Sequence, residues 1–417
     1  MKYIVVVGDG MADRPVQALG GKTPLQVAKK PTINALACKS RMGMVQTIPP
    51  GLPPGSDVGA LSIMGYNPQQ FLTGRAPLEA AASGIDLKPD EVAFRCNLVS
   101  LSEDKVAFSA NTHTLALMED YSAGNIDTQE AKVLIECLQK NLNNEEFQFY
   151  SGVGYRHLMV WKNGSPEFSC TPPHDIPNQN IATHLPVGPQ AEKLHALMTQ
   201  AAALLATHPV NEERRRRGQK PANSIWFWGQ GTRPQMPSFK EKYNLSGCLV
   251  SAVDLAKGIG RLLGLEVLQV PGLTGYLDTN YAGKVQHSMA ALKEVDFAYI
   301  HVEAPDEAGH QGKVEDKIKA IEDLDKFVIA EVLRQVEALK LGDFRLLFLP
   351  DHATPVSLKV HTSEAVPFLL FDSRSAFPSL YPWYDELVSK IHKEAFIQNG
   401  FRLMDLFLEK KLWREIV

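Results

Sequence analysis

The stretch FAYIHVEAPDEAGH, residues 297–310, places a run of apolar residues directly before acidic residues and a histidine. The same arrangement occurs twice more, where YIVVV at 3–7 is followed by Asp9 and RLLFL at 345–349 is followed by Asp351. Uninterrupted apolar runs of this length are typical of strands that a parallel sheet buries on both faces. The sequence therefore predicts a parallel sheet whose strands end in carboxylates.

Helical patterns separate these strands. Residues 314–333 repeat apolar side chains at helical spacing, and residues 253–263 and 385–396 have a similar pattern. Alternating strands and helices predict an α/β fold with helices on both faces of the sheet, and such sheets bind ligands outside the carboxyl ends of their strands. The predicted apolar face of 314–333 comprises Ile318, Ile321, Leu324, Phe327 and Val328.

Residues 90–222 differ from the rest of the chain. They contain short strand-like runs and an alanine-rich helical stretch, and they end in a polar segment with four arginines at 214–217. The apolar run SIWFW at 224–228 then resumes the character of a buried strand. We therefore expect a smaller α+β domain at 90–222, inserted into a discontinuous core domain formed by 1–89 and 223–417.

The composition is that of an ordinary globular protein: 44% of the 417 residues are hydrophobic and 22% are charged, with a net charge of −4. A nucleic-acid partner is therefore not expected, and the four arginines, which follow two glutamates, are interpreted as a solvated helix end or linker. No apolar stretch approaches the ~20 residues that span a bilayer. Five dispersed cysteines argue against a disulfide framework, so we expect a cytoplasmic protein without a membrane partner.

Two groups of residues after the predicted strands have side chains suited to divalent cations. Asp306 and His310 lie one helical turn apart, which puts both on one side of a loop or helix start. Asp351 and His352 follow the third strand, and His361 comes nine residues after His352. Each of these residues alone is more simply a capping, turn or surface residue. Their common position after strands of one sheet predicts a metal site.

A serine offers a nucleophile for such a site. Ser56 follows the segment PPGLPPG at 49–55 and is expected to be the N-cap of a helix that begins near Asp57. A helix N-terminus favours a phosphate dianion, and a serine there becomes a nucleophile if a metal lowers the pKa of its hydroxyl. The alternative is a serine that only caps the helix. The candidates for a two-metal phosphoryl-transfer site are Asp9, Ser56, Asp306, His310, Asp351, His352 and His361.

These residues lie in segments that resemble a known family. GDGMAD from residue 8, PPGSDVG from 53, PDEAGHQG from 305, PDHATP from 350 and VHTSE from 360 are similar to motifs of the archaeal type of cofactor-independent phosphoglycerate mutase, in the alkaline phosphatase superfamily. The resemblance covers essentially the whole chain, including LTGRAPLEAA from 72, YRHLMV from 155 and WGQGTRPQMPSF from 228. Ala353 stands where glycine is common in relatives, a change that leaves the ligands untouched.

The resemblance implies an alkaline-phosphatase-like α/β core, with a mostly parallel sheet between helices. It also implies an isomerase that interconverts 3-phosphoglycerate and 2-phosphoglycerate through a phosphoserine, without 2,3-bisphosphoglycerate and with two divalent ions (Mn²⁺, Zn²⁺ or Mg²⁺). One ion would be held by Asp9, Ser56, Asp351 and His352, and the other by Asp306, His310 and His361.

The substrate of such an enzyme carries a phosphate and a carboxylate, to which the planar guanidinium of arginine is suited. Arg75, Arg156 and Arg233 lie in the family-like segments, and His157 and Lys257 are further candidates. The alternative role for each is a surface or interdomain salt bridge. Arg156 and His157 would lie on the insert, and they would face the metals only if the domains close, which would exclude water and protect the phosphoserine.

Other functions use similar residues. A phosphatase, a phosphodiesterase or another phosphomutase could be built on the same two-metal serine site. Some bacterial relatives are described as homoserine kinases, but the chain has no GxxxxGK[ST] motif for a nucleotide. A non-catalytic metal-binding protein would not require a nucleophile beside the ligands. The sequence does not indicate the oligomeric state.

Overall fold

Two compact units make up the chain. One unit consists of Met1–Leu72 and Gln235–Val417, and the other of Thr73–Pro234. The second unit therefore extends beyond both ends of the predicted insert at 90–222. The computed structural model describes residues 1–103, 106–108, 115–375, 377–379, 381–391, 395–411 and 415.

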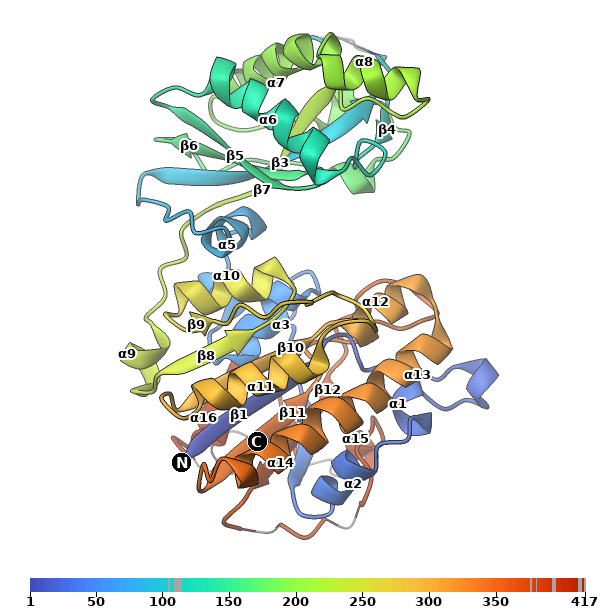
Figure 1. Cartoon of the computed structure of the whole chain (residues 1–417), viewed down its shortest axis with the longest axis vertical. Helices are drawn as coiled ribbons and strands as arrows, with labels where there is room; N and C mark the ends of the chain where they lie inside the picture. The colour runs from blue at the N-terminus through green and yellow to red at the C-terminus, as the bar shows by residue number, and fades with distance from the viewer. Residues whose placement is uncertain are drawn as a thin grey trace. The chain divides into compact units, whose positions relative to one another are not determined.

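The larger unit contains an eight-stranded sheet in the order β13-β2-β12-β11-β1-β10-β8-β9 (Figure 1). Strand β12 is antiparallel to both of its neighbours, and the other strand pairs are parallel. The prediction of a mostly parallel α/β sheet is confirmed. The strands are β1 (Lys2–Gly8), β2 (Arg41–Val45), β8 (Gly247–Val250), β9 (Glu266–Val267), β10 (Phe297–Val302), β11 (Phe344–Leu349), β12 (Val366–Asp372) and β13 (Phe396–Ile397).

The three predicted strands are the centre of this sheet. Strand β1 pairs with β10 on one side and with β11 on the other, both in parallel, and Val7 lies opposite His301 and Leu349. The side chains of Ile4, Val5, Val6 and Val7 are all fully buried, as expected for a strand covered on both faces. Because the three strands run in the same direction, their carboxyl ends meet at one edge.

Helices cover both faces of the sheet. Alternate residues of β8 show this, because Cys248 and Val250 pack in the same cluster as α11 (Tyr281–Ala291), whereas Leu249 lies under Gly260 of α10 (Asp254–Leu262). The helical run after β10 consists of α12 (Ala304–Gln311), α13 (Val314–Asp323), the π-helical turn η4 (Leu324–Ile329) and α14 (Ala330–Ala338).

Two helical predictions need correction. Within 314–333, Ile321, Leu324 and Val328 are buried, but Phe327 is 40% exposed. A π-helical turn contains more residues than an α-helical turn, so η4 shifts the apolar face relative to a regular helix. In 385–396 the described helix is limited to α15 (Val388–Ile391), and Phe396 begins β13 instead. Residues 392–394 lie outside the described ranges.

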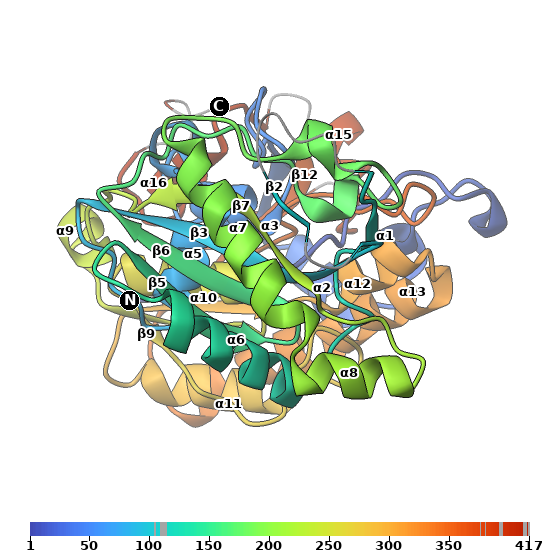
Figure 2. The same cartoon turned by 90° about the horizontal axis from the view of Figure 1, so that it is seen from above.

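The smaller unit is built on an antiparallel sheet. Strands β4 (Met118–Asp120), β3 (Glu91–Leu101), β6 (Arg156–Lys162) and β5 (Phe147–Val153) follow one another, and β7 (Ser224–Thr232) also pairs with β3. The segment 224–228, which we expected in the core domain, therefore belongs to this sheet, because its backbone hydrogen bonds go to β3. Helices α6 (Thr128–Leu142) and α7 (Ala191–Ala206) cover one face of the sheet (Figures 1 and 2). Helix α5 (Arg75–Ala82) packs on the other face.

The four arginines lie at the end of α8 (Pro209–Arg216) and at Arg217. Arg214 is buried rather than solvated: it donates to the carbonyl oxygens of Ala123 and Lys220 and pairs with Glu130. Arg217 also pairs with Glu130. Arg214 and Arg217 therefore have their charges paired within the smaller unit. Among the described residues, no helix combines the length and apolar character needed to cross a membrane.

Candidate active site

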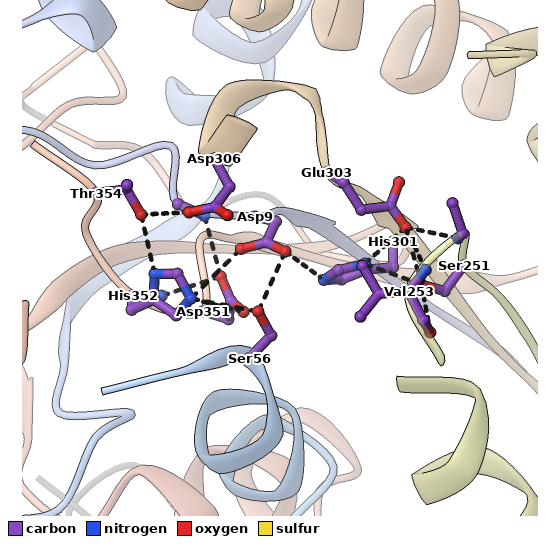
Figure 3. A network of polar contacts seen from close by, with 12 residues as sticks. Asp9, Ser56, Ser251, Val253, His301, Glu303, Asp306, Asp351, His352 and Thr354 are labelled. Carbon is purple, nitrogen blue, oxygen red and sulfur yellow. Dashed lines mark hydrogen bonds and ion pairs between the residues drawn. The ribbon is translucent and has the colours of Figure 1, made fainter. Parts of the chain in front are cut away.

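Acidic residues meet at the carboxyl edge of the parallel sheet (Figure 3). Asp9 follows β1, Asp351 and His352 follow β11, and Asp306 lies in the first turn of α12 after β10. Asp9 and Asp351 are 1% and 0% exposed, so water does not solvate their charges. The topology therefore brings together residues more than 290 positions apart in the chain.

Ser56 lies against this group. It is the first residue of α3 (Ser56–Ile63), whereas the predicted N-cap position is taken by Gly55. Because the helix begins one residue earlier than predicted, the Ser56 hydroxyl is not used as a cap. Its Oγ lies 3.3 Å from Asp9 Oδ2 and 3.4 Å from His352 Nε2.

One cluster of possible ligands consists of Asp9, Asp351 and His352. His352 Nε2 lies 3.4 Å from Asp9 Oδ1 and 3.5 Å from Asp351 Oδ2. Asp351 Oδ1 accepts hydrogen bonds from the backbone N–H groups of Gly10 and His352, at 3.1 and 3.0 Å. In contrast, Asp9 Oδ1 and Asp351 Oδ2 are buried and have no hydrogen-bond partner in the part of the chain that the structure describes. Buried acceptors without partners are costly, so these two oxygens fit a cation.

A second cluster surrounds Asp306. His310 Nε2 is 3.2 Å from Asp306 Oδ2, and His361 Nε2 is 3.4 Å from Asp306 Oδ1. The same two histidine nitrogens are 2.8 Å apart. His352 also has a ligand atom within 4.8 Å of those of Asp306 and His361, so it is shared between the two clusters.

The three histidines are oriented in the same way. In each ring Nδ1 faces an oxygen: the Lys359 carbonyl for His310 at 3.0 Å, the Pro54 carbonyl for His361 at 3.3 Å, and Thr354 Oγ1 for His352 at 3.3 Å. The Nε2 atom of each ring therefore points toward the carboxylates. Metal-binding histidines are typically held in this manner, with one ring nitrogen bonded to an oxygen and the other free for the ion.

The electrostatics of the group also fit a cation. Burial, together with the charges of Asp351 and Asp306, raises the pKa of Asp9 well above its usual value. Burial alone would raise the pKa of Asp306 too, but hydrogen bonds from His310 and His361 hold it well below its usual value. The bond to Asp306 raises the pKa of His310 to about 9. Divalent cations would offset the mutual repulsion of these carboxylates.

Two glycines allow these segments to approach one another. Gly10 has a φ of +58°, and a Cβ there would collide with Asp306 and Thr354. Gly59, inside α3, faces the backbone of Asp351, where a Cβ would come within 2.8 Å. Side chains at either position would push apart the elements that carry the ligands.

Comparisons with known proteins show the family of the chain. A family model described as 2,3-bisphosphoglycerate-independent phosphoglycerate mutase matches residues 37–211. A probable 2,3-bisphosphoglycerate-independent phosphoglycerate mutase of Geobacter sulfurreducens is 50% identical over 410 residues, covering 98% of this chain and 100% of the relative. The corresponding mutase of Methanosarcina acetivorans is 46% identical, covering 93% and 94%.

The chain belongs to the 2,3-bisphosphoglycerate-independent phosphoglycerate mutases. The cofactor-independent phosphoglycerate mutase of Thermoplasma acidophilum has a similar structure, with a TM-score of 0.66 and 26% identity over 98% of this chain and 100% of the other. The PH0037 protein of Pyrococcus horikoshii has a TM-score of 0.79 and 26% identity, covering 99% and 98%. The predicted family and isomerase class are confirmed.

The predicted substrate-binding residues of this mutase are distributed over both units. In the smaller unit, Arg75 is the first residue of α5, Arg156 begins β6 with an exposed side chain, and Arg233 pairs with Asp86. His157 is only 2% exposed, and its Nδ1 accepts from the Gly152 N–H at 3.0 Å. Burial lowers the pKa of His157 to about 3. In the larger unit, Lys257 lies on α10 with its Nζ 3.1 Å from Asp254 Oδ1.

The smaller unit of the mutase contains a further arginine that the sequence interpretation missed. Arg95 on β3 is 8% exposed, pairs with Glu79 of α5 at 3.1 Å, and lies 4.1 Å above the ring of Trp228. Burial lowers the pKa of Arg95; Glu79 opposes this effect, while the charges of Arg75 and Arg156 lower the pKa further. The signal was a single arginine within the apolar run VAFRCNLV, where a charge requires a partner.

Proposed function

We propose that this chain interconverts 3-phosphoglycerate and 2-phosphoglycerate by passing the phosphoryl group through Ser56. The observation that carries the proposal is the position of the Ser56 hydroxyl, within 3.4 Å of both Asp9 and His352 and at the start of a helix. A hydroxyl with neighbouring carboxylate and imidazole groups is suited to nucleophilic attack on phosphorus.

The donor set supports two divalent ions, Mn²⁺, Zn²⁺ or Mg²⁺. Among the described residues, two carboxylate oxygens without a hydrogen-bond partner lie near His352 Nε2, and the Nε2 atoms of His310 and His361 lie near Asp306. Hard oxygens mixed with imidazole nitrogens suit these cations. When bound, such ions lower the pKa of the attacking hydroxyl and neutralise charge on the transferred group. Asp9, Ser56, Asp351 and His352 would hold one ion, and Asp306, His310 and His361 the other.

The reaction proceeds in two displacements at phosphorus. Ser56 Oγ forms a bond to phosphorus while the bond from phosphorus to the C3 oxygen breaks, and the proton lost by Ser56 is balanced by the proton that the C3 oxygen gains. The glycerate then turns, and its C2 hydroxyl oxygen forms a bond to phosphorus while the bond from phosphorus to Ser56 Oγ breaks; the proton that the C2 hydroxyl loses is balanced by the proton that Ser56 Oγ regains. Because the phosphoryl group returns to the same glycerate, no 2,3-bisphosphoglycerate is consumed.

The anionic groups of the substrate need cationic partners. We assign this role to Arg75, Arg156 and Arg233 of the smaller unit, with His157 and Lys257 as further candidates. The positive charges that act on Arg95 support the assignment, since Arg75 and Arg156 are close enough to lower its pKa. A group of guanidiniums is suited to a phosphate or a carboxylate. The predicted closing role of the insert stays a prediction.

The decisive experiment measures conversion of 3-phosphoglycerate to 2-phosphoglycerate, coupled to enolase, without 2,3-bisphosphoglycerate. It compares Mn²⁺ with EDTA, and Ser56→Ala with Ser62→Ala. Ser62 lies on the same helix, but its hydroxyl donates to the Thr47 carbonyl, away from the proposed ligands. We expect metal-dependent turnover that Ser56→Ala abolishes and Ser62→Ala retains.

The same assay can reject the proposal. Metal-dependent phosphate release from a simple ester, without any mutase turnover, would move the assignment to a phosphatase that uses the same serine. Full mutase turnover by Ser56→Ala would show that Ser56 is not the nucleophile.

A further inference from the structure

A buried polar network lies beside Asp9, on the side away from His352 (Figure 3). His301 is on β10, Glu303 follows the same strand, Ser251 follows β8, and Lys284 is on α11. The side chains of His301 and Lys284 are fully buried, and that of Glu303 is 2% exposed. Burying this many polar groups costs free energy unless they have partners. The contacts of each group therefore indicate what the network does.

The Nδ1 side of the His301 ring is held firmly. Its Nδ1 lies 3.1 Å from Glu303 Oε1 and 3.2 Å from Ser251 Oγ. Glu303 is fixed in turn, because Lys284 Nζ donates to its Oε2 at 2.8 Å and the Ala252 N–H donates to its Oε1 at 2.6 Å. Lys284 also donates to the His301 carbonyl at 2.6 Å. The ring therefore has little freedom to turn.

The Nε2 side of the ring points to the active site. His301 Nε2 lies 3.4 Å from Asp9 Oδ2 and has no hydrogen-bond partner among the described residues. The Ser56 hydroxyl donates to Asp9 Oδ2 at 3.3 Å, whereas Asp9 Oδ1 has no hydrogen-bond partner among the described residues and faces the proposed ligand His352 at 3.4 Å. Oδ2 of Asp9 thus faces Ser56 and His301, and Oδ1 faces the side of the proposed metal ligand His352. In Asp351, backbone N–H groups hold Oδ1, and Oδ2 has no hydrogen-bond partner among the described residues but lies 3.5 Å from His352 Nε2.

We propose that His301 is a positioning residue whose ring, fixed at Nδ1 by Glu303 and Ser251, places Nε2 against Asp9 Oδ2 and so directs Asp9 Oδ1 to the metal. The inference rests on the proposed metal site. A carboxylate held at one oxygen loses less rotational freedom when its other oxygen binds an ion, and groups that orient ligands in this way typically contribute 10- to 100-fold to metal affinity, to order of magnitude. His301 acts through Asp9 and not as a ligand, because its ring is held back by Glu303 and Ser251.

The test uses two substitutions of His301, one that can keep the contact to Asp9 and one that can keep only the contact to Glu303. In His301→Gln the side-chain amide is long enough to reach Asp9, as Nε2 does, whereas in His301→Asn the shorter amide reaches only the Glu303 side. His287→Asn is the matched control, since His287 is on α11 near Lys284 and its Nδ1 faces the Gly283 carbonyl of its own helix. Mn²⁺ is titrated calorimetrically into the full-length chain after EDTA treatment, and thermal unfolding of the metal-free protein is recorded for each variant.

We expect His301→Asn to weaken the binding of one Mn²⁺ about 10-fold or more, and to leave the second ion unchanged. His301→Gln should retain most of the affinity, and His287→Asn all of it. Activity lost by His301→Asn should return as the Mn²⁺ concentration is raised. A role in folding alone would weaken both ions together and lower the unfolding temperature of the metal-free protein.

The inference is overturned if His301→Asn binds both ions as tightly as the wild type, if the Asn and Gln variants are equally impaired, or if both ions weaken together. Failure of the wild type to bind Mn²⁺ is a separate outcome. It would reject the proposed metal site itself.

Discussion

The two units of this mutase gather opposite charges by different means. In the larger unit, carboxylates and imidazoles collect where three parallel strands end, because parallel strands bring their carboxyl ends to one edge. In the smaller unit, Arg95 lies in the middle of an antiparallel strand, on the face that α5 covers with Glu79. A loop edge can concentrate several ligands around an ion, whereas a sheet face spaces out its charged side chains.

The difference also concerns how each charge is compensated. Among the described residues, Asp9 and Asp351 each keep one buried oxygen without a hydrogen-bond partner, which fits the proposed cation. Arg95 instead has a carboxylate and an aromatic ring as partners within its own unit. The proposed ions would therefore complete the site of the larger unit, whereas the buried charge of Arg95 already has its partners within the smaller unit.

The largest effect should come from removing a ligand of the larger unit. Asp351→Ala takes away one of the open oxygens and should lower kcat/KM by about 10³-fold or more, since a metal contributes several kcal/mol to transition-state stabilisation. Calorimetry should show the loss of one Mn²⁺ per chain, and the enolase-coupled assay gives the rate. If Asp351→Ala binds two ions with normal affinity, Asp351 is not a metal ligand, and the proposed compensation of its charge by an ion is wrong.

The next largest effect should be a loss of stability of the smaller unit. Glu79→Gln leaves the Arg95 charge buried without its counter-charge, so the free energy of unfolding should fall by about 2–4 kcal/mol. Urea unfolding followed by tryptophan fluorescence measures it. The control is Glu213→Gln, which removes an exposed pair with Arg216 and should cost less than about 1 kcal/mol. Equal losses in the two variants would contradict the buried role of Glu79.

A smaller effect should separate substrate binding from metal binding. Arg156→Ala removes one proposed partner of a substrate anion, so KM should rise about 10- to 100-fold, the value of a hydrogen bond to a charged group. Binding of Mn²⁺ should not change, because the ligands lie in the other unit. The variant is assayed over a range of 3-phosphoglycerate concentrations. An unchanged KM would exclude Arg156 from substrate binding.

The smallest effect concerns pH and a carboxyl away from the metal ligands. Burial raises the pKa of Glu386 to about 7, although Thr23 and the Asp13 N–H donate to it. The folded state then binds the proton more tightly than the unfolded state, so this residue stabilises the fold below about pH 4.5 and loses that contribution as pH rises toward 7. Glu386→Gln should reduce this decline by about 1–2 kcal/mol, allowing for partial exposure.

Urea unfolding of wild type and Glu386→Gln between pH 4.5 and 8 gives this difference. Parallel curves over the whole range would show that Glu386 titrates normally. The residue lies in the larger unit, so the smaller unit should keep its own pH dependence in both proteins.

Much of the fold was predictable because its signals are local. Apolar runs identified β1, β10 and β11, and the side chains that follow them indicated where a site would form. Phe327 and the segment 224–228 were misplaced for the opposite reason. Packing with distant residues decides where a π-helical turn forms and which strand pairs with which. The local sequence pattern indicates neither.

The sequence by itself determined the family, the α/β class and which side chains follow the strands of the sheet, because motif words and apolar periodicity are properties of neighbouring residues. Only the tertiary structure decided that Asp9 lies between His352 and His301, and that Arg95 is paired inside a sheet. Those facts are distances between residues far apart in the chain. They follow from the order and direction of the strands, which no local pattern specifies.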